Sequence, residues 1–340
     1  MSQRLVQRVM VMLSLLLMAV GTSLSAQAAP ASKAPKSTKS AAAPARSVNK
    51  APVRKSRAKA SKRKRASAGK AEADDTRLRS NSVLVVDRDS GELVALKNPD
   101  TVLPIASLTK LMTGLVVLDA GLPLDEMLEI GPDDVDTERH THSRLVVGSQ
   151  LRRDELLLLA LMSSENRAAK ALGRHYPGGR AAFIAQMNEK ARALGMSSTH
   201  FADTAGLSNG SRSTARDLQY LIRAAHAQPL MRRYSTQPEA EVTVKGRSLT
   251  FVNSNRLVRS TGGDWKIDLQ KTGFTNEAGR CLVMQATVLG RRLMMVFLDS
   301  NGTMTRYADA ARVRRQLELQ AKIGKPVKAR ESVLAAGAAS

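Results

Sequence analysis

Three short motifs in this chain contain the residue types that acyl transfer through a serine ester requires. In chain order they are Ser107-Leu-Thr-Lys110, Ser164-Glu-Asn166 and Lys271-Thr-Gly273. A serine hydroxyl is a poor nucleophile until a neighbouring base takes its proton. Residues i and i+3 of a helix share a face, so the amine of Lys110 can reach the hydroxyl of Ser107. The first motif therefore predicts a nucleophile with its base.

The second and third motifs supply the other groups that such a reaction needs. Ser164 and Asn166 are expected in a tight turn between two helices, where both can point the same way as a relay and a substrate hydrogen-bond partner. Lys271 is expected at the end of a strand, where its charge can bind a carboxylate and lower the pKa of Lys110. A lysine serves as a base only when its pKa falls, through desolvation or a nearby positive charge. Gly273 would let a substrate backbone approach closely.

The elements that must position these motifs lie between about residues 80 and 322. Turn formers at 87–91 separate two β-rich runs and predict an antiparallel hairpin. Hydrophobic periodicity predicts helices over 106–120, 154–162, 166–175, 179–194, 214–227 and 303–322, and strands over 241–250, 267–271, 280–289 and 292–298. Ser107 then lies in the first helical turn, where the positive end of the helix dipole favours an oxyanion.

This order predicts an α+β fold, with one antiparallel sheet assembled from both ends of the chain. Helices flank the sheet, and a helical subdomain is inserted between its two halves. The default place for a site is the cleft between the sheet and the inserted helices. We expect the domain to cover 78–322 and a frayed tail to follow over 323–340.

The first 28 residues are expected to be a secretory signal peptide. Arg4 and Arg8 precede an apolar run over 9–20, and Ala26-Gln-Ala28 fits a cleavage site. A run of about 12 residues is short for spanning a bilayer. An uncleaved anchor is the alternative, and either way the working part would leave the cytoplasm.

The net charge of +23 is concentrated in residues 31–70, which hold 14 Lys and Arg and no Asp or Glu. The rest of this segment is mostly Ala, Ser and Pro, which cannot bury enough apolar surface to fold. We therefore expect a basic disordered linker over 29–77. It has no aromatic residue to stack on a base, so nucleic-acid binding is disfavoured. A plain solvated linker and an electrostatic tether to the anionic cell envelope stay open.

The cysteine and the histidines suggest no further chemistry. Cys281 is the only cysteine, which excludes an intramolecular disulfide, and its strand context predicts a buried hydrophobic side chain. His140 and His142 lack the companions of a metal site and are expected in a surface loop. We expect no metal and no cofactor. Spacing alone leaves open a Ser-His-Asp triad using one of the other histidines, which are His175, His200 and His226.

The motifs and their surroundings resemble the low-molecular-mass penicillin-binding proteins, which are D-alanyl-D-alanine carboxypeptidase and endopeptidase serine peptidases. The resemblance covers about 78–320, and its motifs stand in the segments 104–113, 161–166, 203–207, 213–217 and 270–275. It implies a DD-peptidase/β-lactamase-like fold and an acyl-enzyme mechanism on peptidoglycan stem peptides. β-Lactams would be covalent inhibitors, and the protein would work in the periplasm.

The resemblance also assigns a role to each motif residue. The catalytic group would be Ser107 as nucleophile, Lys110 as base and Ser164 as relay. The substrate-binding group would be Asn166, Lys271, Thr272, Gly273 and Phe274. By the same pattern, the backbone N–H groups of Ser107 and Phe274 would form the oxyanion hole.

Within this family the chain is most similar to the endopeptidase type. The carboxypeptidases carry a further β-rich domain and an amphipathic anchor, whereas only 67 residues follow Gly273 here. A carboxypeptidase and a class A β-lactamase are alternatives, although no Glu-x-x-x-Asn for a deacylating water lies between Asn166 and Lys271. A non-catalytic envelope-binding protein is a more distant alternative, and it would not need Lys110.

Overall fold

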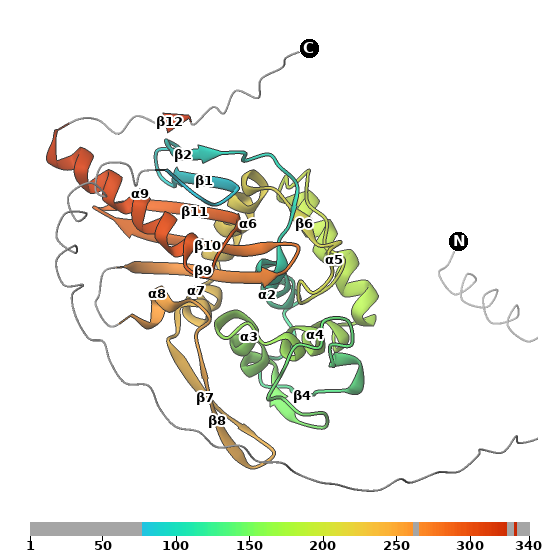
Figure 1. Ribbon diagram of the computed structural model, residues 1–340. Helices are drawn as coiled ribbons and strands as arrows, with labels where there is room; N and C mark the ends of the chain where they lie inside the picture. Colours follow the sequence, from blue (N-terminus) through green and yellow to red (C-terminus); the bar gives the residue numbers. More distant parts are fainter. Residues whose placement is uncertain (1–76, 261–264, 325–329, 332–340) are drawn as a thin grey trace, which may run out of the picture. The chain divides into compact units, whose positions relative to one another are not determined.

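The computed structural model describes residues 77–260, 265–324 and 330–331 (Figure 1). The expected signal peptide over 1–28 and the basic linker, apart from its last residue, lie outside these described residues. No helix within the described ranges is both long and apolar enough to cross a membrane.

A six-stranded sheet carries the fold (Figure 1). Its strand order is β12-β2-β1-β11-β10-β9. The strands in this order are Arg330–Glu331, Leu93–Lys97, Ser82–Asp87, Arg291–Ser300, Gly279–Val288 and Lys266–Thr275. All neighbours are antiparallel except β12 and β2, which are parallel. Strands from both ends of the described chain therefore share one sheet, as predicted.

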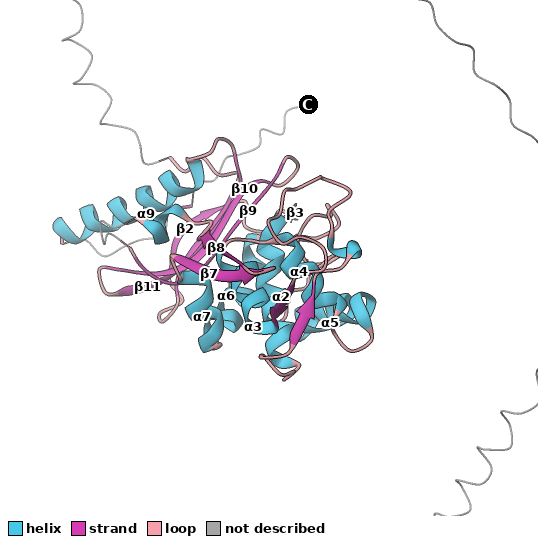
Figure 2. Cartoon of the chain, turned by 90° about the horizontal axis from the view of Figure 1, so that it is seen from below, coloured by secondary structure: helices cyan, strands magenta, loops and turns pink. Residues whose placement is uncertain are grey.

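Both faces of this sheet are buried. Successive side chains of a strand point to opposite faces, and β1 is buried at every position. Val83 and Val85 join a cluster with Tyr307 and Val313 of helix α9 (Thr305–Lys322). Leu84 and Val86 of β1 join the larger cluster, which includes residues of most of the other helices. Figure 2 shows α9 on one side of the sheet and most of the other helices on the opposite side.

The helical block lies between the two parts of the sheet in sequence. It comprises the short turn η1 (Ala106–Leu108), α2 (Thr109–Asp119), η2 (Pro132–Asp134), α3 (Arg153–Met162), α4 (Asn166–Arg174), α5 (Gly179–Ala193), α6 (Ala215–Ala227), α7 (Pro229–Thr236) and α8 (Arg256–Arg259). Helix α2 is buried at nine of its eleven positions. It is therefore a core helix that the others surround, and it can hold a side chain away from water.

The prediction of a single strand over 241–250 is wrong, because this segment is a hairpin of two strands. Strands β7 (Glu239–Val244) and β8 (Arg247–Val252) pair with each other and form a separate two-stranded sheet. Lys245 and Gly246 between them have φ values of 47° and 74°. Two consecutive positive φ values make the tight turn that matches the twist of a hairpin. Two further small sheets pair β3 (Leu103–Pro104) with β6 (Arg212–Ser213) and β4 (Met127–Glu129) with β5 (Gln150–Arg152).

The expectation that the third motif ends a strand is also wrong. Strand β9 continues to Thr275 and stays paired with β10 as far as Gly279. Lys271 and Gly273 thus stand within an edge strand of the main sheet. Of the tail expected to be frayed, residues 330–331 form the edge strand β12.

Candidate active site

Ser107 stands in the 3₁₀ turn η1, just before α2, and not in the first turn of an α-helix as expected. Ile105 and Leu108 on either side are fully buried and anchor the turn. Ala106 has a φ of 47°, which is rare for a residue with a side chain. Such backbone persists only where the surrounding structure enforces it. The serine is therefore presented by a fixed turn.

Lys110 reaches this serine, as the spacing of the first motif predicts. Its side chain is fully buried, and its Nζ donates to Ser107 Oγ at 2.8 Å. The same Nζ donates to Asn166 Oδ1 at 2.7 Å and to the carbonyl oxygen of Ala205 at 2.6 Å. Three acceptors thus fix the amine beside the hydroxyl.

The environment of Lys110 makes it a better base. Burial lowers its pKa to about 8, against the opposing charges of Asp203 and Glu165. Desolvation disfavours the charged ammonium form, so the neutral amine is accessible near physiological pH. Of the two causes that the sequence suggests, desolvation and the charge of Lys271, desolvation is the main one.

Lys271 lies across the site from Lys110. It is fully buried, and its Nζ donates to Ser164 Oγ at 2.7 Å and to the carbonyl oxygen of Thr272 at 3.0 Å. Burial holds its pKa well below the usual value, and the charges of Lys110 and Arg306 add to this effect. A carboxylate brought beside Lys271 would raise this pKa again, because an opposite charge favours the ammonium form.

The turn between α3 and α4 brings the second motif into the same site, as predicted. Ser164 has a φ of 64°, and Asn166 is the first residue of α4. Glu165 caps the helix by accepting the N–H of Arg167. Asn166 Nδ2 donates to Thr141 Oγ1 at 3.0 Å, while its Oδ1 faces Lys110. The carboxamide is therefore held at both ends.

The remaining residues of the third motif lie along β9. Thr272 is nearly buried and donates to Ser254 Oγ at 2.8 Å. Phe274 is 50% exposed, with the guanidinium carbon of Arg280 4.2 Å from its ring centre. A Cβ placed on Gly273 would lie 3.3 Å from the nitrogen of Ser107. The chain's own nucleophile turn therefore approaches Gly273 closely, and the approach of a substrate backbone at this position stays a prediction.

Sequence reasoning missed Arg306, which comes from α9. It is 7% exposed, and within the described residues its Nε and Nη1 have no hydrogen-bond partner. Its Nη2 donates to Tyr307 Oη at 3.1 Å, and its charge lowers the pKa of Lys271. It stands in an arginine-rich helix with no motif around it, so the sequence offers no signal to single it out. Glu165 and Asp203, whose charges act on Lys110, stand in the motif segments, but the sequence analysis gave them no role.

The histidines take no part in this arrangement. His140 and His142 are exposed, as expected for a surface loop. In the described part of the chain, no three residues of the metal-liganding types His, Cys, Asp and Glu cluster together. The other histidines bond elsewhere: His175 Nε2 with the carbonyl oxygen of Glu129, His226 Nδ1 with Arg88 Nη1, and the backbone of His200 with Arg212.

Cys281 is fully buried in β10, as predicted. Burial raises the pKa of its thiol to about 11. Since the thiolate is the reactive form, this cysteine is a structural side chain.

Comparisons with known proteins agree with this geometry. Residues 68–302 match the family model described as D-alanyl-D-alanine carboxypeptidase. The chain is 50% identical over 243 residues to a D-alanyl-D-alanine endopeptidase of Pseudomonas aeruginosa, covering 71% of this chain and 78% of that one. It is 44% identical over 248 residues to a protein of the same name from Escherichia coli, covering 72% and 79%.

A solved structure supports the fold. The crystal structure of the Streptomyces K15 DD-transpeptidase is 28% identical, with a TM-score of 0.64, over 70% of this chain and 97% of that chain. The predicted DD-peptidase type of fold is thereby confirmed.

Proposed function

This chain belongs to the D-alanyl-D-alanine carboxypeptidase family, and from that membership we propose that it is a serine D-alanyl-D-alanine endopeptidase. It would cut the peptide cross-links of peptidoglycan through an acyl-enzyme on Ser107. The observation that carries this proposal is the bond of 2.8 Å between Lys110 Nζ and Ser107 Oγ, made by a lysine whose pKa is lowered to about 8. A non-catalytic binder needs no such pair.

Acylation would begin with neutral Lys110, which accepts the proton of Ser107. The serine oxygen then attacks the carbonyl carbon of the D-alanine before the scissile bond. The N–H groups of Ser107 and Phe274 would stabilise the negative charge on the carbonyl oxygen, since preorganised donors act where charge develops. When the C–N bond breaks, the leaving amine takes a proton, delivered from Lys110 or through Ser164. Water then hydrolyses the ester and frees Ser107.

The carboxylate of the substrate would bind Lys271 and Thr272. Lys271 Nζ donates to Ser164 Oγ, so the residue that would bind the carboxylate is hydrogen-bonded to the residue that would relay the proton. Asn166 is held by Lys110 and Thr141, which supports its role as a hydrogen-bond partner of the substrate backbone. A penicillin presents the same carboxylate and a strained amide, so it would acylate Ser107 as well.

The names of the two relatives above support the endopeptidase type over the carboxypeptidase type. The test is fluorescent penicillin labelling, followed by digestion of purified cross-linked muropeptides. Conversion of dimers to monomers supports the proposal. Removal of only the terminal D-alanine of a pentapeptide would indicate a carboxypeptidase, and rapid hydrolysis of the penicillin would indicate a β-lactamase. A protein that neither labels nor digests would contradict both the mechanism and the residue roles.

The proposal also covers where the protein works in the cell and what the segments outside the catalytic domain do. We propose a signal peptide over 1–28, a periplasmic location and a catalytic domain over 78–322. The 14 basic residues of 31–70 would tether this domain to the anionic envelope. Deleting 31–70 should leave penicillin acylation unchanged and weaken pelleting with cell-wall sacculi. Pelleting of the parent should fade with added salt, because the Debye length falls from about 10 Å at 0.1 M to about 3 Å at 1 M. Equal, salt-insensitive pelleting of both forms would indicate a plain linker.

A further inference from the structure

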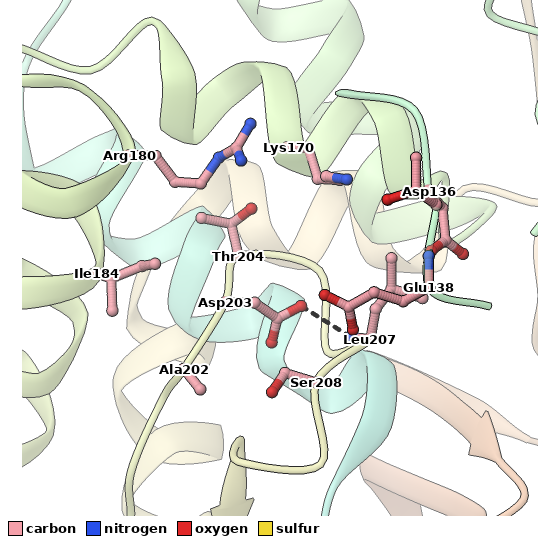
Figure 3. A pocket seen from close by; sticks show the side chains of 11 residues that line it. Asp136, Glu138, Lys170, Arg180, Ile184, Ala202, Asp203, Thr204, Leu207 and Ser208 are labelled. Carbon is pink, nitrogen blue, oxygen red and sulfur yellow. Dashed lines mark hydrogen bonds between the residues drawn. The ribbon is translucent and has the colours of Figure 1, made fainter. Parts of the chain in front are cut away.

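A cavity of about 220 Å³ lies beside the loop whose Ala205 accepts a hydrogen bond from Lys110 (Figure 3). One wall of this cavity is the loop 202–208, and α4 and α5 contribute Lys170, Arg180 and Ile184. Among the described residues that line it, none belongs to the three motifs. The carbonyl oxygen of Ala205 accepts from Lys110, and the preceding Thr204 lines the cavity. The cavity and the active site therefore share a wall.

Two polar groups of this cavity lack the partners that buried groups normally have. Thr204 is 1% exposed, and its Oγ1 has no hydrogen-bond partner within the part of the chain that the structure describes. The same holds for the buried Nε of Arg180. Most buried polar atoms of native proteins are paired, so each exception calls for a partner such as a ligand or water. A hydroxyl and a guanidinium N–H together suit a carboxylate oxygen.

The side of the cavity formed by α4 and α5 is positive. Lys170 Nζ donates to the carbonyl oxygen of Val135 at 2.8 Å, and no carboxylate of the described residues pairs with it. Arg180 Nη2 donates to the carbonyl oxygen of Asp133 at 3.0 Å and lies 3.9 Å from Asp134 Oδ1. Backbone carbonyls thus fix both side chains, and Figure 3 shows them on one side of the cavity.

Three carboxylates, of Asp136, Glu138 and Asp203, also line the cavity. Asp203 is held by its own loop, because its carboxylate accepts from Ser211 Oγ at 2.6 Å and from the N–H of Leu207 at 2.8 Å. Asp136 likewise accepts from three backbone N–H groups and a hydroxyl of its own loop. Glu138 is exposed at the rim, and its carboxylate makes no ion pair with any described residue. A bound ammonium group could therefore pair with Glu138.

We propose that this cavity binds a small α-amino carboxylate in its zwitterionic form. The carboxylate would lie between Arg180, Lys170 and Thr204, and the ammonium group would face Glu138. Ile184 and Ala202 would contact a small apolar side chain. The volume lies below the roughly 300–1,000 Å³ of pockets that take drug-sized ligands, so the ligand is small.

Two sources can supply this chemistry. One is a free amino acid such as D-alanine. The other is the leaving group of the reaction, because a DD-peptidase frees the amine of a residue that carries its own carboxylate. Only this second source rests on the proposed function, since the charges and the unpaired groups of the cavity do not depend on it.

Calorimetric titration of D-alanine tests the site. The protein is used as Ser107→Ala and, in parallel, as the parent acylated with penicillin, which blocks the active site. D-Alanine should bind both forms with equal affinity. D-Lactate lacks the ammonium group and ethylamine lacks the carboxylate, so each should bind at least about tenfold more weakly, which corresponds to about 1.4 kcal/mol. Loss of D-alanine binding on acylation would place its site in the catalytic cleft and overturn the proposal.

Variants of the cavity supply the second test. Arg180→Gln, Thr204→Val and Glu138→Gln should each weaken D-alanine binding at least about tenfold. The matched control is Arg192→Gln, which removes an exposed arginine from the same helix α5 and should bind like the parent. Thr204→Val should also keep its melting temperature without ligand, because the hydroxyl it removes is unpaired. Parent-like D-alanine binding by Arg180→Gln and Glu138→Gln would contradict the site, whatever Thr204→Val does.

A final experiment distinguishes the two sources of the ligand, a free amino acid and the leaving group of the reaction. A soluble muropeptide with a free amino-carboxylate end is compared with D-alanine on the Ser107→Ala protein. Tighter binding of the muropeptide, lost in Arg180→Gln, supports the leaving group as the ligand, whereas equal or weaker binding supports a free amino acid. Failure of muropeptide digestion would contradict the proposed function but leave D-alanine binding untouched.

Discussion

Gly206 packs directly against the peptide that precedes Ser107. A Cβ built on Gly206 would overlap the carbonyl oxygen of Ala106 and lie 2.9 Å from the nitrogen of Ser107. Gly206 also has a φ of 77°, which glycine adopts without strain. The next residue back, Ala205, supplies a carbonyl oxygen to Lys110. One short loop therefore supports both the nucleophile and its base.

Gly206→Ala should displace the nucleophile turn and lower penicillin acylation by at least about a hundredfold, because a misplacement of about 1 Å can cost that much. The matched control is Gly91→Ala. Gly91 has a similar φ of 73° but no atom within 4 Å of its would-be Cβ. It carries the backbone strain without the overlap, so it should acylate like the parent. Equal acylation by both variants, measured by stopped flow, would remove the steric argument.

Ser107→Ala should abolish covalent labelling by penicillin without unfolding the protein. The side chain makes one hydrogen bond to Lys110 and a longer one to Ala205, so its loss costs little stability. Intact-mass spectrometry should show an adduct on the parent and none on the variant. Ser163→Ala is the control, because among the described residues Ser163 Oγ donates only to the carbonyl oxygen of Leu159 in the helix α3, which Ser163 caps. An adduct that persists on Ser107→Ala would refute the nucleophile assignment.

Lys271→Ala should raise the acylation barrier by about 3 kcal/mol, at about 1.36 kcal/mol per tenfold in rate. It removes the cation that would bind the carboxylate and the donor to Ser164 Oγ. Lys271→Arg should retain part of the rate because the charge survives. Rates are measured with a penicillin under single-turnover conditions. Acylation of Lys271→Ala at the parent rate would mean that the clamp role is wrong.

The acylation rate should rise with pH and level off above about 8. Lys110 acts only as the neutral amine, and its pKa is lowered to about 8. Below that value the reactive fraction falls about tenfold per pH unit. Glu165 raises the pKa of Lys110, so Glu165→Gln should move the rising limb to lower pH. A profile that is flat between pH 6 and 8, or a shift to higher pH in the variant, would contradict the assignment of the base.

Arg306→Leu should lower acylation while leaving the melting temperature unchanged or higher. The guanidinium is buried with two nitrogens unpartnered among the described residues, which costs stability. Its positive charge acts at Lys271, where the substrate carboxylate would bind, and would attract that carboxylate. Loss of this attraction should slow acylation. Arg306→Lys keeps the charge and should retain more activity. The role would be excluded if Arg306→Leu acylated at the parent rate.

The sequence by itself determined most of the helices and strands and the residue types that each motif supplies. Residue periodicity reports which face of an element is buried, and this is why the helix around Lys110, the strand around Cys281 and the sheet built from both ends were predicted. The pairing of Ser107 with Lys110 also follows from sequence, because three residues along a helical turn have a fixed geometry.

Turns and strand ends were predicted less well. The hairpin at Lys245 and Gly246 was missed because a single run of β-rich residues hides a change of direction that depends on two φ values. The strand that carries Lys271 was ended too early, since pairing with β10 keeps it extended to Thr275.

Only the tertiary structure decided which distant residues meet. Ser164 and Lys271 are 107 residues apart and lie within hydrogen-bond distance because the edge strand of the sheet runs past the turn between α3 and α4. The charge of Arg306 acts on Lys271 from a helix on the far side of the sheet, and Gly206 fits because a loop crosses the nucleophile turn. Such contacts depend on how whole elements pack, and no local pattern of residues encodes them. Burial is also a property of that packing, so the lowered pKa that makes Lys110 a base appears only once the chain is folded.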